Sequence, residues 1–102
     1  MSVRRVVHIH GGARERRREL ARALQDLGVT VLLSSNAAEA AKCFADAQVH
    51  ISVIFNDALV AETIQTQRHD VRCVQPSRTE PVGEITHMVL QLLRQCVPTS
   101  ST

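Results

Sequence analysis

The sequence predicts an α/β domain with three layers, α/β/α, in which helices cover both faces of a four-stranded parallel sheet. Short apolar runs rich in β-branched residues alternate four times with segments of helical periodicity. Apolar residues make up 44% of the 102 residues and aromatic residues only 2%, so the core is built from small aliphatic side chains. That composition suits helices packed on a parallel sheet, and right-handed crossovers then place helices on both of its faces.

The first strand and helix contain the most informative stretch of the chain. We expect a strand over residues 3–10 that ends at Gly11 and Gly12, followed by a helix over 13–27. Alternation along the strand divides its side chains between two faces, with Val7 and Ile9 on one and Val6, His8 and His10 on the other. In open α/β folds such a strand-to-helix corner is where ligands usually bind.

The remaining elements follow in the same alternation. Strands are expected over 29–33, 49–55 and 71–74, and helices over 37–47, 58–67 and 82–95. The second helix can be capped by Ser34, Ser35 or Asn36, and the third by the pair Asn56-Asp57. One domain over 1–96 accounts for all of them, and the Ser/Thr-rich tail 97–102 is expected to be disordered.

Charge, cysteine content and hydropathy limit the setting. The net charge is only +2, but seven arginines precede residue 23, against two glutamates. These arginines form a solvated helix face or meet an anionic partner. Neither a membrane span nor a signal peptide is recognisable, so we expect a cytoplasmic protein. The three cysteines are widely spaced, and we expect Cys43 and Cys73 to be small core residues.

Several segments together resemble the receiver domain of bacterial response regulators, which has a flavodoxin-like fold. The similarity is best in Val-Val-His-Ile with its helix ending Leu-Gly-Val-Thr-Val, in Ser-Asn-Ala-Ala-Glu-Ala, in Ser-Val-Ile-Phe-Asn-Asp, and in Val-Gln-Pro before the last amphipathic helix. The resemblance implies a parallel sheet with strand order 2-1-3-4. In the family, an acidic pair binds magnesium after the first strand, an aspartate accepts the phosphoryl group, and a lysine precedes a cis-proline.

This chain departs from the family at each of those positions. His10 and Gly11 stand where the acidic pair should be, Asn56 at the acceptor position and Gln75 at the lysine position. Only 18 residues lie between Asn56 and Gln75, so one strand and helix of the family are missing. The resemblance therefore implies a receiver-like domain that is not phosphorylated, although Asp57 remains an off-register candidate acceptor.

A second resemblance is to the IIB subunits of sugar phosphotransferase systems, which have four parallel strands and a phosphorylated cysteine after the first. Here His10 would stand at the nucleophile position, with Gly11 and Gly12 behind it. The start of the following helix, with Arg14, would then face the anion. This alternative is a phosphoryl carrier with a candidate anion site made of His10, Gly11, Gly12 and Arg14.

Other chemistry has less support from the residues. His8, His10 and His50 could approach one another as metal ligands, but His8 is better explained as a hydrogen-bonded core residue and His10 as a strand-end residue near solvent. Dinucleotide and Walker motifs are absent, so we expect no cofactor and no enzyme activity. A nucleic-acid-binding regulator that uses the N-terminal arginines stays open as a third alternative.

The sequence therefore favours a receiver-like module that binds a partner protein or a second copy of itself. The last helix carries a wide apolar stripe in which Ile85, Val89 and Leu92 are expected to be core residues. The expected partner surface consists of Met88, Leu92, Leu93, Arg16 and Arg17. A homodimer is expected because amphipathic last helices commonly associate.

Overall fold

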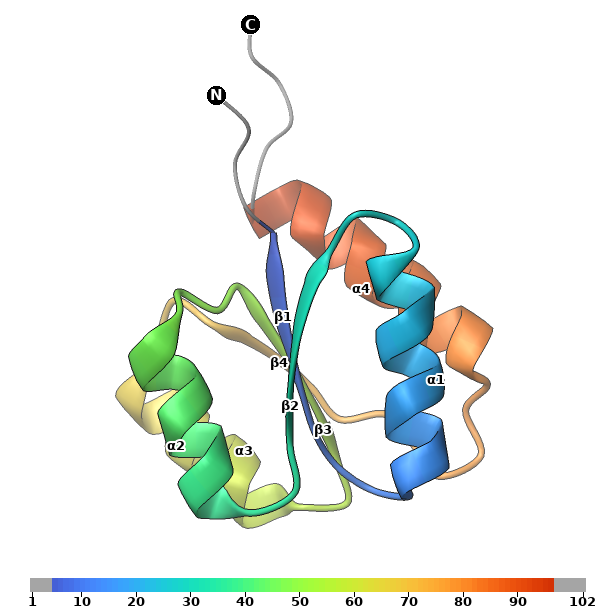
Figure 1. Ribbon diagram of the computed structural model, residues 1–102. Coiled ribbons are helices and arrows are strands. Elements are labelled where there is room, and N and C mark those ends of the chain that lie inside the picture. Colours follow the sequence, from blue (N-terminus) through green and yellow to red (C-terminus); the bar gives the residue numbers. More distant parts are fainter. Residues whose placement is uncertain (1–4, 97–102) are drawn as a thin grey trace, which may run out of the picture.

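The computed structural model describes residues 5–96, which form three layers around a parallel sheet (Figure 1). The chain alternates strand and helix: β1 Val6–Gly11, α1 Arg14–Gln25, β2 Thr30–Ser34, α2 Ala37–Asp46, β3 Ile51–Phe55, α3 Ala58–Gln67, β4 Arg72–Val74 and α4 Val82–Cys96. The strand order β2-β1-β3-β4 confirms the expected fold class and topology. The tail 97–102 lies outside the described residues, and no helix within 5–96 is long and apolar enough to cross a bilayer.

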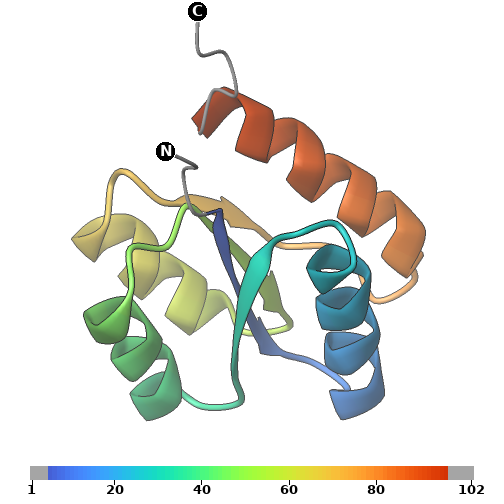
Figure 2. The same ribbon diagram turned by 45° about the horizontal axis from the view of Figure 1, so that its top comes forward.

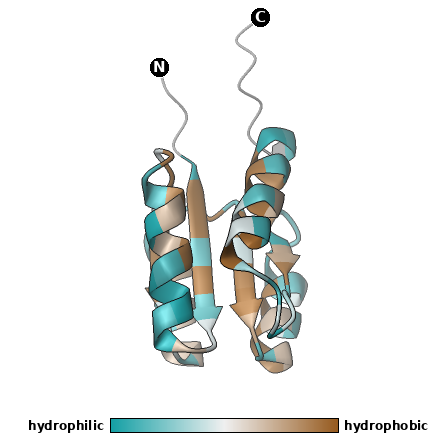
Figure 3. Ribbon diagram, turned by 90° about the vertical axis from the view of Figure 1, so that its right-hand side faces the viewer, coloured by the Kyte–Doolittle hydropathy of each residue, from teal (hydrophilic) through white to brown (hydrophobic). Residues whose placement is uncertain are grey.

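Two pairs of helices cover the two faces of the sheet. Figures 1 and 2 both show α1 and α4 on one side and α2 and α3 on the other. In Figure 3 the strands are largely brown, whereas teal concentrates on the helices, so the apolar side chains converge on the sheet. This division matches the alternation of β1, whose Val7 and Ile9 face α1 and α4 while His8 and His10 face α2 and α3.

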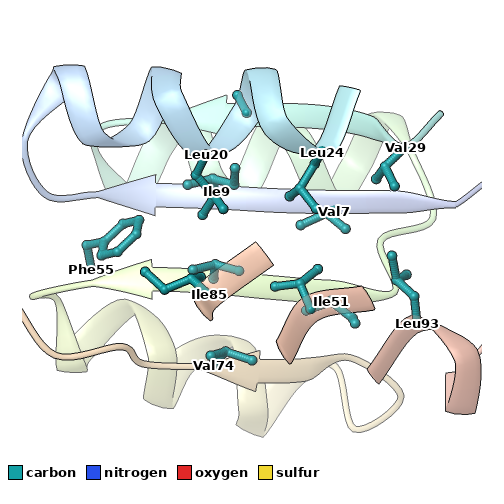
Figure 4. Packing of buried hydrophobic residues seen from close by; sticks show 13 residues of the cluster. Val7, Ile9, Leu20, Leu24, Val29, Ile51, Phe55, Val74, Ile85 and Leu93 are labelled. Carbon is teal, nitrogen blue, oxygen red and sulfur yellow. The ribbon is translucent and has the colours of Figure 1, made fainter. Parts of the chain in front are cut away.

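The core beneath α1 and α4 is entirely apolar. Val7, Ile9, Ile51 and Val53 on the strands are completely buried against Leu20 and Leu24 of α1 and Ile85, Val89 and Leu93 of α4 (Figure 4). The stripe of α4 that meets the core is therefore 85, 89 and 93. Leu92, expected in the core, is only half-buried, and Leu93, expected at a partner surface, is fully buried; that expectation for Leu93 is wrong.

Several expected boundaries move by one to three residues. The third helix is confirmed at Ala58–Gln67, but the strand expected from residue 49 begins at Ile51 and the helix expected to reach 27 ends at Gln25. That helix closes with Val29 N–H donating to Leu24 O and Gly28 N–H to Gln25 O, a turn made possible by the φ of 85° at Gly28. Cys43 and Cys73, expected in the core, are both half-buried, and Cys73 packs against the core beneath α2 and α3.

The glycine corner after β1 is a close contact between two strand ends. Gly11 and Gly12 have φ values of 76° and 70°, in the left-handed region that disfavours other residues. A Cβ atom on Gly11 would lie 2.5 Å from the Phe55 carbonyl oxygen, and one on Gly12 would lie 2.6 Å from the Phe55 Cβ. The two glycines thus let the end of β1 lie directly against the end of β3.

Gly11→Ala should lower the free energy of unfolding by at least about 2 kcal/mol, because the backbone strain adds to a clash with a carbonyl that cannot move freely. Gly83→Ala is the matched control: this glycine lies within α4 with open space around it. There alanine should stabilise by about 0.5–1 kcal/mol. Urea unfolding measures both, and an unchanged midpoint for Gly11→Ala would contradict the close packing of the corner.

Candidate functional site

An open pocket of about 590 Å³ lies at the carboxyl ends of the strands, where the sequence places its candidate residues. Its lining residues lie at or just beyond the ends of all four strands, at the start of α1 or in the segment before α4: Gly11, Gly12, Ala13, Arg16, Ser35, Phe55, Asn56, Asp57, Pro76 and Arg78. Four of the candidate positions, Gly11, Gly12, Asn56 and Asp57, are brought together. His10, Arg14 and Gln75 are not part of the lining.

Two arginines at the start of α1 hold backbone carbonyls in place. The Arg16 guanidinium donates to the carbonyl oxygens of Ser77, Arg78 and Glu80 and lies over the Phe55 ring, 5.2 Å from its centroid. Arg17 donates to the carbonyl oxygens of both corner glycines at 2.9 Å. Both arginines of the expected partner surface therefore bind backbone carbonyls around the pocket.

Arg14 faces a different part of the surface. It is exposed and lines a shallow pocket of about 250 Å³ together with Arg17, Arg18 and Glu39. The four residues of the candidate anion site are therefore not together: Gly11 and Gly12 line the main pocket, Arg14 lines the shallow one, and His10 is buried in the interior.

The expected lysine position of the receiver family, Gln75, is exposed just beyond β4. The peptide bonds of residues 5–96 are all trans, including the one before Pro76.

Asp57 is the carboxylate that lines the main pocket. As the N-cap of α3 its Oδ1 accepts the Val60 N–H at 3.3 Å, and its Oδ2 accepts the His10 Nε2–H at 2.9 Å. The hydrogen bond from His10 lowers the pKa of Asp57, and the bond from Val60 adds to it. Asn56, just before it, adopts a φ of 55°, so the chain turns sharply between β3 and α3.

Asp57 and four buried polar side chains behind it form one hydrogen-bonded series of five residues, which we call the buried polar chain. From Asp57 it runs through His10, Ser34 and His8 to Ser52. The successive distances are 2.9, 2.7, 2.6 and 2.8 Å. The exposed fraction of Ser34 is 3% and that of the other three buried members is 0%. The interpretation of His8 as a hydrogen-bonded core residue is confirmed, whereas that of His10 as near solvent is wrong, since Ser34 and Asp57 enclose it.

The carboxylate fixes the direction of every bond in this chain when both histidines are neutral. An ionised Asp57 can only accept, so His10 carries its proton on Nε2 and accepts the Ser34 hydroxyl proton at Nδ1. The Ser34 oxygen must then accept from His8 Nε2–H. His8 Nδ1 is left to accept from Ser52. Each donor therefore points toward Asp57.

Burial holds His8 in its neutral form. Desolvation lowers its pKa from 6.5 to about 4, and the neighbouring His10 acts in the same direction. The His8 ring packs edge-on against Phe44 of α2, with centroids 5.2 Å apart. Among the buried side chains described, no nitrogen or oxygen lacks a partner. The imidazole rings of His8 and His10 can therefore be buried, because Ser34 and Ser52 provide hydrogen-bond partners for their ring nitrogens.

Sequence reasoning treated Ser34 only as a candidate helix cap and missed Ser52, although the strand register identifies both as partners of the histidines. Ser34 is the direct partner of His10 across β1 and β2, and Ser52 is the direct partner of His8 across β1 and β3. Each is a serine in an otherwise largely apolar strand, and that was the available signal.

The residues of the site do not fit a magnesium ion. Magnesium prefers several oxygen ligands, with carboxylates among them. The pocket has one carboxylate, Asp57, and two guanidinium groups, Arg16 and Arg78, while Arg17 already binds the carbonyls of the corner. No group of three or more His, Cys, Asp or Glu residues within 5–96 is arranged to hold a metal. His50 is also separate from the other two histidines, since its Nδ1 accepts the Val6 N–H.

A second concave surface lies between α2 and α3, on the face opposite α4. It is an apolar groove of about 400 Å³, lined on the α2 side mainly by alanines and on the α3 side by Leu59, Val60 and Ile64. The Leu59 side chain is 77% exposed. On α4, in contrast, Met88 and Leu92 are half-buried against the core, so the expected partner surface there is largely used in folding.

Comparison with known proteins relates the chain to one fold. It is similar to the response regulator TrrA of Thermotoga maritima, whose structure was determined in complex with Mg²⁺–BeF. The TM-score is 0.68 at 17% sequence identity, and the match covers 89% of this chain and all of that one. No family model and no curated protein sequence matches. The chain therefore has the receiver-like, flavodoxin-like fold that its segments resemble.

Stability should fall as the pH decreases below about 6.5. The folded state resists protonation of His8 down to about pH 4, whereas the unfolded chain binds the proton near 6.5, so the stabilising effect is complete above 6.5 and lost below it. We expect a decrease of about 2 kcal/mol in the free energy of unfolding between pH 7 and roughly pH 5.

His8→Gln should flatten this pH dependence, while His87→Gln, at an exposed position on α4, should keep it. Urea unfolding at a series of pH values measures the slope. Equal slopes for the wild-type chain and His8→Gln would contradict the assignment to His8.

Proposed function

We propose that the chain is a cytoplasmic, receiver-like protein–protein interaction module of bacterial signalling or regulation, neither an enzyme nor a phosphoryl acceptor. The observation that carries the proposal is the charge of the main pocket. Its carboxylate, Asp57, is already bonded by His10 and Val60, and the other charged groups of the lining are the guanidinium groups of Arg16 and Arg78. Phosphoryl transfer to a carboxylate in a receiver needs a metal-binding acidic pair, and His10 and Gly11 stand in its place.

The phosphoryl-carrier alternative requires a free imidazole nitrogen at His10. Both ring nitrogens are bonded, Nδ1 to Ser34 and Nε2 to Asp57, and the residue is fully buried. The nucleic-acid alternative requires arginines that can contact phosphates, but the guanidinium groups of Arg16 and Arg17 donate to backbone carbonyls. The other arginines of α1 are exposed and alternate with Glu15 and Glu19. Both alternatives have less support than a protein-binding role.

The groove between α2 and α3 is the surface that we propose for association, with a second copy of the chain as its occupant. Leu59 projects beside the groove that it helps to line, so the same face offers both an apolar knob and an apolar hollow. A two-fold axis across this face would place each Leu59 in the groove of the other copy, which is the arrangement of a self-complementary interface. Exposed apolar patches of this kind commonly mark protein contacts.

Incubation with acetyl phosphate and magnesium should leave the intact mass of the protein unchanged, because no acidic pair is present to hold the metal. Asp57→Asn and His10→Ala serve as controls that identify the acceptor if an adduct does form. A phosphorylated species lost in Asp57→Asn, or an acid-labile one lost in His10→Ala, would refute the proposal and favour the corresponding alternative.

The wild-type chain should sediment as a dimer at micromolar concentration, and Leu59→Ser should shift it to monomer. Leu27→Ser is the matched control, since Leu27 is also exposed, at 53%, but lies after α1 and away from the groove. Analytical ultracentrifugation measures both variants. A monomeric wild-type chain, or equal effects of the two substitutions, would exclude this interface.

A further inference from the structure

The two edge strands of the sheet differ in how well they are protected from pairing with another chain. β4 has three residues, its Arg72 is exposed, and Pro76 follows it closely. Short length, charge and proline are the usual features that keep an edge strand from pairing. β2, in contrast, has five residues, Thr-Val-Leu-Leu-Ser, without charge or proline. The edge open to a further strand is therefore that of β2, seen between α1 and α2 in Figure 1.

Two residues of β2 turn their backbone groups away from the sheet. Thr30 N–H donates to the carbonyl of Arg5, directly before β1. Because the peptide groups of alternate residues in a parallel ladder point to the same neighbour, those of Val31 and Leu33 point outward. The contact of the Cys43 thiol of α2 with the Leu33 carbonyl oxygen, at 3.7 Å, agrees with this direction. A carbonyl oxygen has two lone pairs, so Leu33 can still accept from another strand.

One stripe of α1 faces this edge and carries charges of both signs. It follows the i, i+3, i+4, i+7 spacing of a single helix face and consists of Glu15, Arg18, Glu19 and Arg22. Together with Leu33 these side chains line a hollow of about 500 Å³. All four are exposed, and none of them is in an ion pair with another residue of 5–96. Arg18 and Leu33 also line the shallow pocket beside Glu39, so the middle of the stripe is level with β2.

We propose that the β2 edge and this stripe of α1 form an interface for a second copy of the chain, in which an antiparallel β2–β2 pair joins two sheets into one. The contact lies at the side of the sheet and is separate from the groove between α2 and α3. It therefore goes beyond the proposed function and does not depend on it. Two observations support it: the outward backbone groups of β2 and the order of the charges along α1.

A two-fold axis through Leu32, perpendicular to the sheet, matches the backbone groups. It places Val31 of each copy opposite Leu33 of the other, where the two residues exchange both of their N–H···O=C hydrogen bonds. Both side chains lie on the α1 side, because their register partners on β1 are Val7 and Ile9. The Leu33 side chain is 44% exposed in the single chain, and Val31 of the other copy would cover it.

The same axis makes the charges of the two α1 helices complementary. It sets these helices side by side and antiparallel on one face of the joined sheet. Glu15 then faces Arg22 of the other copy, and Arg18 faces Glu19 of the other copy, each pair occurring twice by symmetry. A parallel arrangement would instead oppose like charges, which is unfavourable. The stripe is thus complementary to itself, as an interface between identical copies requires.

The contact is small, so we expect it to be weaker than the contact through the groove. Its apolar part is mainly Leu33, and exposed ion pairs each contribute little. Dimers formed through the groove should therefore associate further through β2 only at submillimolar concentration.

Leu59→Ser provides the background for the test, because it removes the apolar knob of the groove and leaves β2 intact. In analytical ultracentrifugation this variant should be a monomer at micromolar concentration and a dimer at submillimolar concentration. A variant that stays monomeric at submillimolar concentration would overturn the β2 interface. Equal masses of the variant and the wild-type chain at micromolar concentration would count against the groove alone.

Charge reversal on α1 tests the pairing between copies. In the Leu59→Ser background, Glu15→Arg and Arg22→Glu should each raise the Kd of the submillimolar dimer by about tenfold, because each opposes like charges. The double substitution exchanges the two signs and should restore the affinity. Glu84→Arg, at an exposed position on α4, is the matched control and should leave the Kd unchanged. A double variant that binds no better than the single variants would overturn the antiparallel arrangement.

Amide hydrogen exchange in the same background tests the strand pairing itself. Exchange at Val31 and Leu33 should slow in step with the fraction of dimer as the concentration rises, because their N–H groups gain acceptors only in the dimer. The Leu32 amide points to β1 and is the internal reference. Exchange at Val31 and Leu33 that does not depend on concentration would contradict the β2–β2 pair.

Discussion

The hydrogen bond from His10 to Asp57 connects the three parts of the molecule on which the candidate site depends. It joins the end of β1 to the first turn of α3, across the end of β3. The same carboxylate caps α3 through Val60, so one side chain starts a helix and completes the bonding of a buried imidazole. An imidazole left unpaired at this depth would cost about 1–3 kcal/mol, and the bond therefore constrains where α3 can begin.

The polar side chains also specify how the strands pair. His10 lies opposite Ser34 and His8 opposite Ser52, so the register that buries the aliphatic residues of β1 also completes both histidines. A slip of one residue between β1 and β2 would turn Ser34 toward α1 and α4, into a core that has only apolar groups, and leave both imidazoles short of a partner. The buried polar chain thus penalises wrong pairings that small aliphatic side chains alone would tolerate.

The sequence was sufficient for the fold but only partly for the site. Periodicity identified all eight elements and the two faces of β1, because those depend on neighbours along the chain. The burial of His10 could not be seen, since it depends on Asp57, 47 residues away, and on the register with Ser34. The sequence also could not decide whether Leu92 or Leu93 enters the core, because residues three and four positions after Val89 both lie on the same helix face. The packing of α4 against α1 and the sheet places Leu93 in the core.

The arginines show why a basic glycine corner need not be an anion site. A helix start attracts an anion when its cations are free to meet one, but here the donors of Arg16 and Arg17 point at carbonyl oxygens of the chain itself. Arg16 ties α1 to the segment between β4 and α4, and Arg17 ties it to the corner of β1. The two guanidinium groups thus hold the loops around the pocket through hydrogen bonds to backbone carbonyls. Because these cations belong to the chain itself, the hydrogen bonds that hold the corner require no ligand.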